Sequence, residues 1–393
     1  MSRFDKTILQ VVPRLNAGGA ERTTLEIAEA VVRAGGRARA VSEGGRLERE
    51  IEFAGGEVVR APVASKNPLT IWANIARLAV MIREEGVDLI HARSRAPAWS
   101  ALAAARRTGI PFVTTYHGAY STGGAFKRLY NSSMLRGDRV IANSRFTAEQ
   151  IMELDGLEPE RLAVIPRGVD VSIFTPGKVS AERVRGMATA WGVGESPGFK
   201  LLLPARLSPW KGHETAITAL AMLKGRYGDA GPTGQGGGLT LVFCGGAQGG
   251  KALEDRLRAK CEEVGVRAMV HFVGDCADMP AAYAWADIVL SPSTEPEAFG
   301  RVAVEAGAME KPVIASRHGG ARETIINRET GFLTAPGDAG ALAAAIEDVA
   351  AMTPSERRVM GEKARARAVS LYSSAAMCDA TLGVYRSLLA GRG

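Results

Sequence analysis

The sequence predicts an α/β protein of two domains, each with a parallel β-sheet covered by helices on both faces. Three observations support this prediction. The chain has 393 residues, which is too long for one ordinary hydrophobic core. Short strand-like runs alternate with helix-like segments along its whole length. The alternation stops once, in RGVDVSIFTPGKVS, where turn residues lie without a clear period, and then starts again.

The predicted strands of the first half are 6–12, 37–42, 57–62, 88–94, 111–117, 139–144 and 162–166. Those of the second half are 200–207, 239–246, 269–274, 287–293 and 312–316. Each is followed by a helix or a turn. We therefore place the domain boundary near 168–178, with a first domain at 1–170 and a second at 171–372.

Three further segments complete the chain. The tail from Ser355 onward has the pattern of two helices, and we expect the last, within 373–393, to pack on the first domain. The stretch 224–238 has glycines too irregular for a phosphate loop, so it is interpreted as a flexible surface loop. The cysteines lack metal-site spacing and are expected to be reduced core thiols; they are Cys244, Cys261, Cys276 and Cys378.

The composition, 46% hydrophobic and 23% charged, is typical of a soluble globular protein. No apolar run approaches the roughly 20 residues of a membrane span, and the first residues resemble a strand, so we expect a cytoplasmic location. The net charge of +7 is concentrated in residues 1–170, with 24 Lys and Arg against 19 Asp and Glu. This excess suits an anionic membrane surface or an acidic substrate. Nucleic acid is disfavoured, because no basic run is interleaved with aromatic residues.

The stretch STEPEAFGRVAVEAGAMEKPVIASRHGG contains Glu297 and Glu305. On a single helix, residues eight apart are turned by about 80° from each other, so the two carboxylates would not share a face. We therefore place Glu297 in a loop and Glu305 inside a helix that starts near Gly300, so that both reach one ligand. The backbone amides of Phe299, Gly300 and Arg301 then form an anion-binding helix N-terminus. Glu305 is suited to accept hydrogen bonds from a ribose diol.

Other candidates lie at the carboxyl ends of strands, where ligands bind in open parallel sheets. Gly18 and Gly19, in NAGGAER, let backbone amides approach an anion, although a plain tight turn is the alternative. Arg206 and Lys211, in PARLSPWKGHE, are suited to a diphosphate, and the alternative is two solvated loop charges. His117 ends a strand in TYHG, with a structural role as its alternative.

These segments occur together in one family. The chain resembles the retaining nucleotide-sugar glycosyltransferases of glycosyltransferase family 4, from GGAER through TYHG, IANS, IPRGVD and PARLSPWKG to EAFGRVAVEAGAMEKPVIAS. The resemblance implies the GT-B fold, in which two Rossmann-like domains face a central cleft and a C-terminal helix crosses back to the first domain. It also implies transfer of a sugar from a nucleotide diphosphate, with retained anomeric configuration, to a glycan or glycolipid. Lipopolysaccharide or another cell-surface polysaccharide is the expected product.

The resemblance also assigns roles to residues. It implies that the glycine loop lies by the donor phosphates, that Arg and Lys bind the diphosphate, that the second Glu holds ribose, and that the first Glu and the His lie by the donor sugar. The implied donor site is Gly18, Gly19, Arg206, Lys211, Phe299, Gly300, Arg301 and Glu305, and the implied catalytic residues are His117, Glu297, Arg206 and Lys211. A UDP- or GDP-sugar is the expected donor. No cofactor or metal is expected, because no Asp-x-Asp motif is present.

The chain departs from the family pattern at two positions. Ala298 stands where a glycine is frequent, which is tolerable because alanine is small. Glu310 stands where a glycine usually precedes Lys-Pro or Arg-Pro, so the helix end lacks its usual left-handed residue. No enzymatic nucleophile is evident, and the family implies a front-face reaction in which leaving-group oxygens help to deprotonate the acceptor.

The segment YSTGGAFKRLYNSSMLRGDR is interpreted as a contact of the first domain with an anionic membrane. Its apolar residues at helical spacing are Phe126, Leu129, Tyr130, Met134 and Leu135, and its basic residues are Lys127, Arg128, Arg136 and Arg139. Gly123 and Gly124 are expected to form a mobile entry beside His117. The alternative is a core-facing helix with basic ends.

Two other functions are alternatives. A nucleotide-sugar epimerase of the same fold would need added acid and base groups and no acceptor. A non-catalytic sugar-nucleotide-binding subunit would not need the whole set of Arg, Lys and two Glu. A Rossmann dehydrogenase is disfavoured, because the glycine triplet with a following ribose-binding acid is absent.

Overall fold

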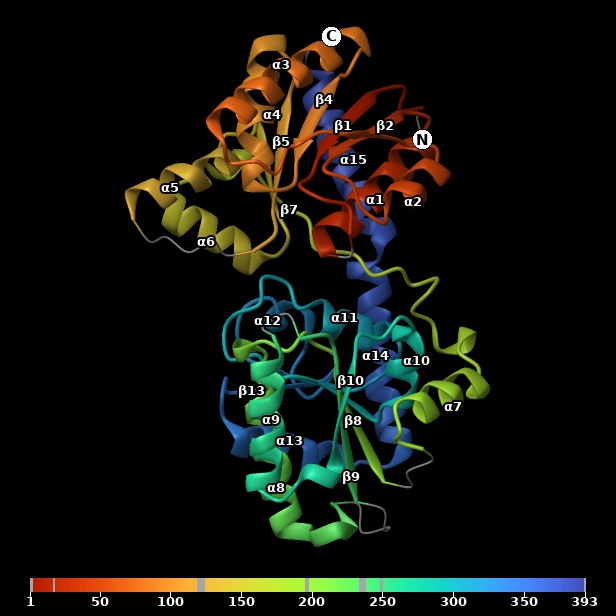
Figure 1. The fold of residues 1–393 in the computed structure, drawn as a ribbon. Helices are drawn as coiled ribbons and strands as arrows, with labels where there is room; N and C mark the ends of the chain where they lie inside the picture. Colours follow the sequence, from red (N-terminus) through yellow and green to blue (C-terminus); the bar gives the residue numbers. More distant parts are fainter. Residues whose placement is uncertain are drawn as a thin grey trace. The chain divides into compact units, whose positions relative to one another are not determined.

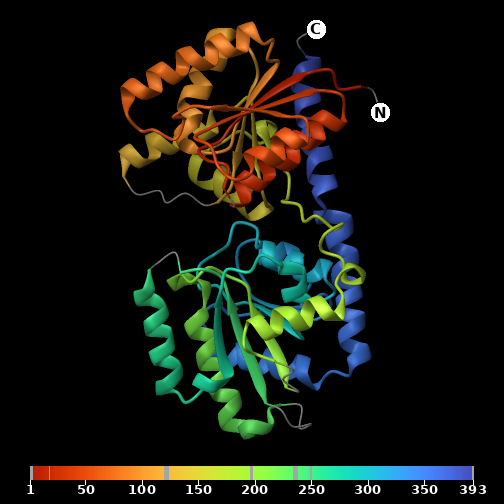
Figure 2. The same cartoon turned by 45° about the vertical axis from the view of Figure 1, so that its right-hand side comes forward.

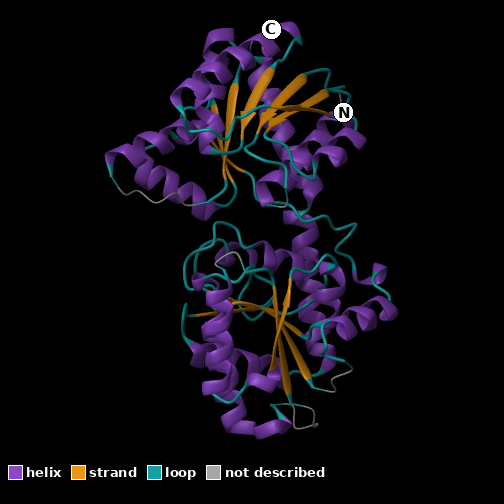
Figure 3. Ribbon diagram, viewed as in Figure 1, coloured by secondary structure: helices purple, strands orange, loops and turns teal. Residues whose placement is uncertain are grey.

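The computed structural model describes residues 3–16, 18–118, 124–194, 198–232, 238–247 and 250–391. The chain divides into two compact units. Unit 1 comprises Met1–Gly168 together with Ser374–Gly393, and unit 2 comprises Val169–Ser373. In each unit a central sheet lies between layers of helices (Figures 1 and 3).

Over its described residues, unit 1 contains a seven-stranded parallel sheet with the strand order β3-β2-β1-β4-β5-β6-β7. The strands are β1 (Thr7–Val11), β2 (Arg37–Ser42), β3 (Glu57–Arg60), β4 (Leu89–Ala92), β5 (Phe112–Tyr116), β6 (Arg139–Ala142) and β7 (Leu162–Val164). The direction in which strands are added reverses between β1 and β4, and ligands of such sheets bind at the carboxyl ends beside this point.

Helices cover both faces of the unit 1 sheet, because successive strand residues point to opposite faces and both sets are apolar. The helices are α1 (Gly19–Arg33), α2 (Glu48–Phe53), α3 (Pro68–Glu84), α4 (Arg95–Thr108), α5 (Ala125–Ser132), α6 (Arg145–Asp155) and α15 (Ser374–Ala390). Buried residues of α3, α4 and α6 pack on one face, and those of α1, α2 and α15 pack on the other. Figure 1 shows α15 running beside α1.

A buried polar network ties α15 to this sheet. The hydroxyl oxygen of Tyr385 lies 2.6 Å from Nδ1 of His91, whose Nε2 lies 2.7 Å from Oγ1 of Thr115. Arg93 is 2% exposed, and its Nε donates to Oε1 of Gln10 at 2.7 Å. Burial, reinforced by Arg93, holds the pKa of His91 well below its usual value, so this imidazole is neutral. The network therefore satisfies polar groups that the core would otherwise leave unpaired.

Over its described residues, unit 2 contains a six-stranded parallel sheet with the order β10-β9-β8-β11-β12-β13. The strands are β8 (Phe199–Leu203), β9 (Leu239–Cys244), β10 (Val270–Gly274), β11 (Ile288–Ser291), β12 (Val313–Ser316) and β13 (Phe332–Thr334). The order reverses between β8 and β11. Strand β13 is not among the predicted strands, because its three residues stand between Gly331 and Pro336, which are turn signals.

Helices again cover both faces of the unit 2 sheet. They are α7 (Ala181–Ala190), α8 (His213–Tyr227), α9 (Lys251–Glu263), α10 (Met279–Trp285), α11 (Arg301–Ala308), α12 (Ala321–Thr324), α13 (Ala339–Ala351) and α14 (Pro354–Tyr372). Buried residues of α8, α9 and α13 form one core, and those of α7, α10 and α11 form the other. Figure 2 shows α8 and α9 side by side. None of the helices in the described residues is both long and apolar enough to cross a lipid bilayer.

The tail forms two helices, α14 and α15, as predicted. The interpretation of 224–238 as a loop was wrong at its start, because α8 continues to Tyr227 and a short 3-10 turn covers Gly228–Ala230. Residues 233–237 lie outside the described residues. In the described residues the four cysteines are free thiols; Cys244, Cys261 and Cys378 are buried as predicted, whereas Cys276 is partly exposed and does not belong to the core.

The proposed membrane segment is only partly helical. Helix α5 gives way to a 3-10 turn at Ser133–Leu135, and this turn points Met134 into the core, where it is 0% exposed. Leu135 is partly buried against the same core, and Arg139 belongs to strand β6. The prediction that these three residues belong to a surface contact was therefore wrong. Gly123 and the side chain of Phe126 lie outside the described residues.

The end of α11 keeps its left-handed residue although glycine is absent. Glu310 has φ 57°, a conformation that costs a residue with a side chain about 1–2 kcal/mol. Arg365 of α14 lies across this turn, with its Nε 3.6 Å from Oε1 of Glu310 and its Nη1 bonded to the carbonyl of Ala308. The packing of α14 on α11 therefore stabilises the left-handed turn at Glu310, although the sequence lacks the usual glycine there.

The stability of unit 2 should fall in mild acid because of His213, which is 2% exposed at the start of α8 with its ring centroid 4.9 Å from that of Phe243. Burial lowers the pKa of His213 from 6.5 to about 4. Between these values the unfolded chain binds more protons than the folded one, so the free energy of unfolding should decrease as the pH falls from 6.5 to 4. The full decrease from this group is about 3 kcal/mol.

Urea unfolding of the wild type and of His213→Gln at pH 7.5, 6, 5 and 4.5 tests this expectation. The variant should be less stable at pH 7.5 and should show a smaller loss between pH 6 and 4.5. Parallel pH profiles for the two proteins would contradict the assignment.

Candidate active site

The predicted residues of unit 2 lie in the loops that follow β8 and β11, the neighbouring strands at which the order reverses, and in the helix α11 after the second loop. A 3-10 turn at Pro209–Lys211 carries Lys211 and ends at Gly212, which has φ 77°. A Cβ atom at Gly212 would overlap the carbonyl of Pro292, so only glycine lets the two loops approach this closely. The amide of Thr294 donates to the carbonyl of Trp210 at 2.7 Å and joins the loops.

The structure brings Glu297 and Lys211 together. Glu297 lies in the loop before α11, as predicted, with its Oε1 2.8 Å from Nζ of Lys211. The same oxygen accepts a hydrogen bond of 2.5 Å from Oγ of Ser293. Lys211 also lies over the ring of Trp210, with Nζ 4.2 Å from the ring centroid. A ligand phosphate at this edge would therefore meet a lysine that already has an internal carboxylate partner.

Glu305 lies inside α11, which begins at Arg301 after Gly300, so the predicted position of this helix is confirmed. Tyr283 donates its hydroxyl hydrogen to Oε2 of Glu305 at 2.8 Å. Nη2 of Arg301 lies 3.0 Å from Oε1 of Glu305. Burial, and secondarily the charge of Glu305, raise the pKa of Tyr283 well above its usual value, so the phenol remains a donor.

The remaining predicted residues of unit 2 differ in exposure. Arg206 is exposed in the loop directly after β8, so its charge is accessible at the carboxyl edge. Phe299 is 3% exposed, and its ring packs on that of Tyr372 with centroids 5.6 Å apart. The side chain of Phe299 is thus part of the core, and only its backbone is left for a ligand. Gly300 precedes the first turn of α11 without a side-chain cap, and the amide of Ala303 in that turn donates to the carbonyl of Gly300 at 3.2 Å, so the amides ahead of Ala303 are the candidates for a ligand.

In unit 1, Gly18 is the N-cap of α1 and Gly19 is its first residue. A Cβ atom at Gly19 would overlap the guanidinium of Arg167, whose Nη2 lies 2.9 Å from Nδ1 of His117. Arg167 thus connects Gly19 with His117. Burial first, and then Arg167 and Arg93, lower the pKa of His117 well below its usual value. Because Arg167 donates to Nδ1 of a neutral ring, the proton of His117 sits on Nε2, which has no partner among the described residues.

Three residues of these sites were not singled out from the sequence: Arg167, Tyr283 and Ser293. Arg167 lies in the motif IPRGVD, which carried the family resemblance without a role for its arginine. Tyr283 and Ser293 lie on either side of β11, in AAYAWADIVLSPS. The role of a buried hydroxyl depends on the group that it contacts in the folded protein, so the sequence alone does not identify Tyr283 or Ser293 as site residues.

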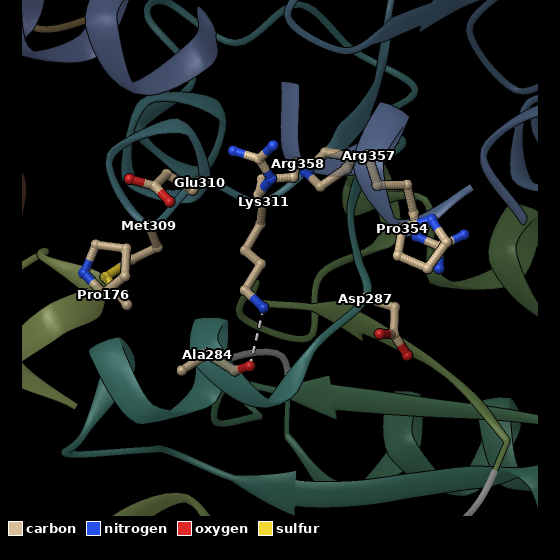
Figure 4. Close-up of a pocket in the computed structure, with 10 residues that line it drawn as sticks. Pro176, Ala284, Asp287, Met309, Glu310, Lys311, Pro354, Arg357 and Arg358 are labelled. Carbon is tan, nitrogen blue, oxygen red and sulfur yellow. Dashed lines mark hydrogen bonds between the residues drawn. The ribbon is translucent and has the colours of Figure 1, made fainter. Parts of the chain in front are cut away.

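A separate cavity of about 280 Å³ lies at the opposite edge of the unit 2 sheet, beside Asp287 and Pro312, which precede β11 and β12 (Figure 4). Lys311 points into this region and donates to the carbonyl of Ala284 at 2.9 Å. Burial lowers the pKa of Lys311. Oδ2 of Asp287 accepts from the amide of Lys200 at 2.9 Å. None of the predicted site residues lines this cavity.

Known proteins are similar to this chain in sequence and in fold. Residues 17–173 match the family described as Glycosyltransferase Family 4, and residues 195–367 match Glycosyl transferases group 1. A crystal structure of a glycosyltransferase from Rickettsia africae ESF-5 is similar, with a TM-score of 0.89 and 33% identity over 98% of this chain and 99% of that one. Anabaena HepE in complex with UDP-glucose has a TM-score of 0.81 and 26% identity, covering 97% of this chain and 99% of that one.

Among curated proteins, a D-inositol 3-phosphate glycosyltransferase of Acidothermus cellulolyticus is 29% identical over 338 residues, which are 80% of this chain and 70% of the relative. The two parallel-sheet units and the structural neighbours confirm the predicted fold class, with two Rossmann-like domains. The site residues described above lie within the two matched segments. The chain belongs to the glycosyltransferases, with a Family 4 domain followed by a group 1 domain.

Proposed function

We propose that this protein transfers a sugar from a nucleotide-diphosphate sugar, UDP-linked or GDP-linked, to a glycan or glycolipid, with retention of the anomeric configuration. The observation that carries the proposal is the pairing of Glu297 with Lys211 and of Glu305 with Arg301 at one edge of the unit 2 sheet. The complex of Anabaena HepE with UDP-glucose favours UDP as the donor nucleotide.

In this proposal each charged group has a distinct role. Arg206 and Lys211 neutralise the charge of the departing diphosphate, and the first amides of α11 bind a phosphate oxygen. Glu305 accepts hydrogen bonds from the ribose hydroxyls. Glu297 contacts the donor sugar. Lys211 exchanges part of its interaction with Glu297 for the diphosphate when the donor binds.

His117 contributes a neutral hydrogen-bond donor. Its Nε2 hydrogen is directed to a hydroxyl of the donor sugar, while Arg167 holds Nδ1. The bond between the anomeric carbon and the phosphate oxygen breaks, and the acceptor oxygen bonds to the same face of that carbon. The acceptor proton passes to the departing phosphate oxygen. Because His117 stays unprotonated at neutral pH, it stabilises charge as a donor and does not act as the acid.

Removing a donor contact should lower activity without unfolding the protein. Thermal protection by UDP-, GDP- and ADP-sugars identifies the donor, whose turnover is then measured for Glu305→Ala and Arg206→Ala. Each loss of a charge-assisted bond should cost roughly 1.5–3 kcal/mol, or about 10- to 150-fold in kcat/KM. Glu347→Ala, which removes a surface ion pair with Arg226, is the control and should keep full activity. Full activity in both site variants would contradict the assignment, and conversion of the donor without an acceptor would indicate an epimerase.

We also propose that catalysis needs no metal ion, because Arg206 and Lys211 supply the positive charge that a metal would supply to the diphosphate. Turnover should therefore be unchanged in excess EDTA. Activity that is lost in EDTA and restored by magnesium or manganese would contradict this proposal.

The proposed acceptor is a lipid-linked glycan, such as a growing lipopolysaccharide core, at the cytoplasmic face of a membrane. The name of the Acidothermus relative refers to a different compound, D-inositol 3-phosphate. Support for the lipid acceptor comes from unit 1, where Leu69 is 79% and Trp72 is 65% exposed on the first turns of α3. Leu129 of α5 is 55% exposed, and Nζ of Lys66 lies 5.9 Å from the ring centroid of Tyr130, which places the start of α3 near α5.

This surface combines apolar and basic side chains. Lys127 and Arg128 are exposed on α5, and Arg136 is exposed over the ring of Trp99 at 5.5 Å from its centroid. Aromatic and aliphatic side chains enter the interface of a bilayer, and each basic residue near an anionic surface contributes about 1 kcal/mol. We propose that these residues hold unit 1 against an anionic membrane.

Vesicle co-sedimentation tests the membrane contact. The wild type should bind phosphatidylglycerol-containing vesicles, more strongly at low salt than at physiological salt. Lys127→Glu/Arg128→Glu should bind at least about thirtyfold more weakly, because two attractive charges are removed and reversed. Trp72→Ala should weaken binding at both salt concentrations, while Lys251→Glu, an exposed position on α9 of unit 2, should have no effect. Equal binding by all variants would favour a soluble acceptor.

A further inference from the structure

Each of the two glutamates at the unit 2 edge is held by one cation and one buried hydroxyl. For Glu305 the hydroxyl belongs to Tyr283 of α10, which is 0% exposed. For Glu297 it belongs to Ser293, two residues after β11, which is 2% exposed. The two hydroxyls come from the two ends of the segment that contains β11, so one short strand positions both.

The hydroxyls matter because both carboxylates are largely removed from water. The side chains of Glu297 and Glu305 are 17% and 13% exposed. A carboxylate that loses its water needs replacement donors, and an unpaired buried one costs several kcal/mol. In the proposed function Lys211, the cation of Glu297, must also bind the diphosphate. The hydroxyl of Ser293 is therefore the partner that stays with Glu297 when the nucleotide sugar binds, whereas Glu305 keeps both Arg301 and the hydroxyl of Tyr283.

The geometry leaves defined acceptor positions on each carboxylate. Arg301 and Tyr283 occupy one oxygen each of Glu305, which fixes the plane of the carboxylate and directs its remaining lone pairs. On Glu297 both partners use Oε1, so that in the described residues Oε2 is left for a ligand. Tyr283 is itself fixed, with its ring centroid 6.0 Å from that of Phe174 in an edge contact.

We propose that Tyr283 and Ser293 are positioning residues that divide donor recognition between them. Tyr283 orients Glu305 toward the ribose, and Ser293 orients Glu297 toward the transferred sugar. The inference rests on the proposed function, which assigns the ribose to Glu305 and the sugar to Glu297. It predicts that the two hydroxyls affect different parts of the same donor.

Calorimetric titration of the full chain with UDP and with UDP-glucose tests this division. Tyr283→Phe removes only the hydroxyl and should raise the Kd for both ligands by the same factor, about five- to tenfold. Ser293→Ala should leave the Kd for UDP within twofold of the wild type and raise the Kd for UDP-glucose by about five- to tenfold. Each variant is thus the matched control of the other.

Phe174→Leu separates positioning from packing, because it loosens the contact with the ring of Tyr283 and keeps the hydroxyl. It should lower the Tm of the unliganded protein and leave both Kd values within twofold. Wild type that binds neither UDP nor UDP-glucose would overturn the proposed donor and this inference with it. If the wild type binds both ligands, and Tyr283→Phe and Ser293→Ala bind them as tightly as the wild type does, only the inference is overturned. An equal loss for both ligands in Ser293→Ala would show a merely structural role and would also overturn it.

Discussion

The removal of two carboxylates from water is the constraint on which the unit 2 site depends. Glu297 and Glu305 are tolerated there because four donors converge on them from four different segments. Lys211 comes from the turn after β8, Arg301 from the start of α11, Tyr283 from α10 and Ser293 from the loop after β11. Lys211 reaches Glu297 because β8 and β11 are neighbours in the sheet although far apart in sequence. The strand order therefore contributes to the stability of the buried carboxylates.

The carboxyl edge of unit 1 has a different electrostatic character. There the central group is the imidazole of His117, which burial and two arginines keep neutral. A neutral ring whose Nδ1 accepts from Arg167 is left with a single donor, Nε2–H. The ring can donate a hydrogen bond to a hydroxyl. At neutral pH it does not release its Nε2 proton, because the ring would then become an anion. This property agrees with chemistry in which the leaving phosphate takes the acceptor proton.

Much of the fold follows from the sequence pattern. Short continuous apolar runs predict strands that are buried on both faces, and amphipathic segments with a period near 3.6 residues predict the helices between them. The position of α11 also followed, since the spacing of Glu297 and Glu305 is incompatible with one shared helix face. Strand β13 did not follow, because its short apolar run lies between the turn residues Gly331 and Pro336. The apolar pattern after α5 misled for a physical reason. Met134 lies in a 3-10 turn, which has three residues per turn instead of 3.6, and it is buried in the core, so the helical surface assumed for this segment does not extend to it.

Only the charged residues near the ends of strands could be predicted as site residues. Glu297, Glu305 and Lys211 were recognisable because charged residues in apolar surroundings at strand ends need partners. Tyr283 and Ser293 were not, since tyrosine and serine beside a buried strand are ordinary core and loop residues. Arg167 was hidden for another reason, because it reaches Gly19 and His117 from a distant part of the chain.

The tyrosine that closes the polar core of unit 1 has a consequence for synthesis of the chain. Tyr385 lies on α15, which follows all of unit 2 in sequence, yet its hydroxyl completes the network around His91 and Arg93. Unit 2 is continuous, so a ribosome that has released Val169–Ser373 has released all of its residues. Unit 1 begins first and is completed last. Its sheet must wait, with His91 uncovered, until the final helix emerges, which makes the nascent unit 1 a natural client for a chaperone.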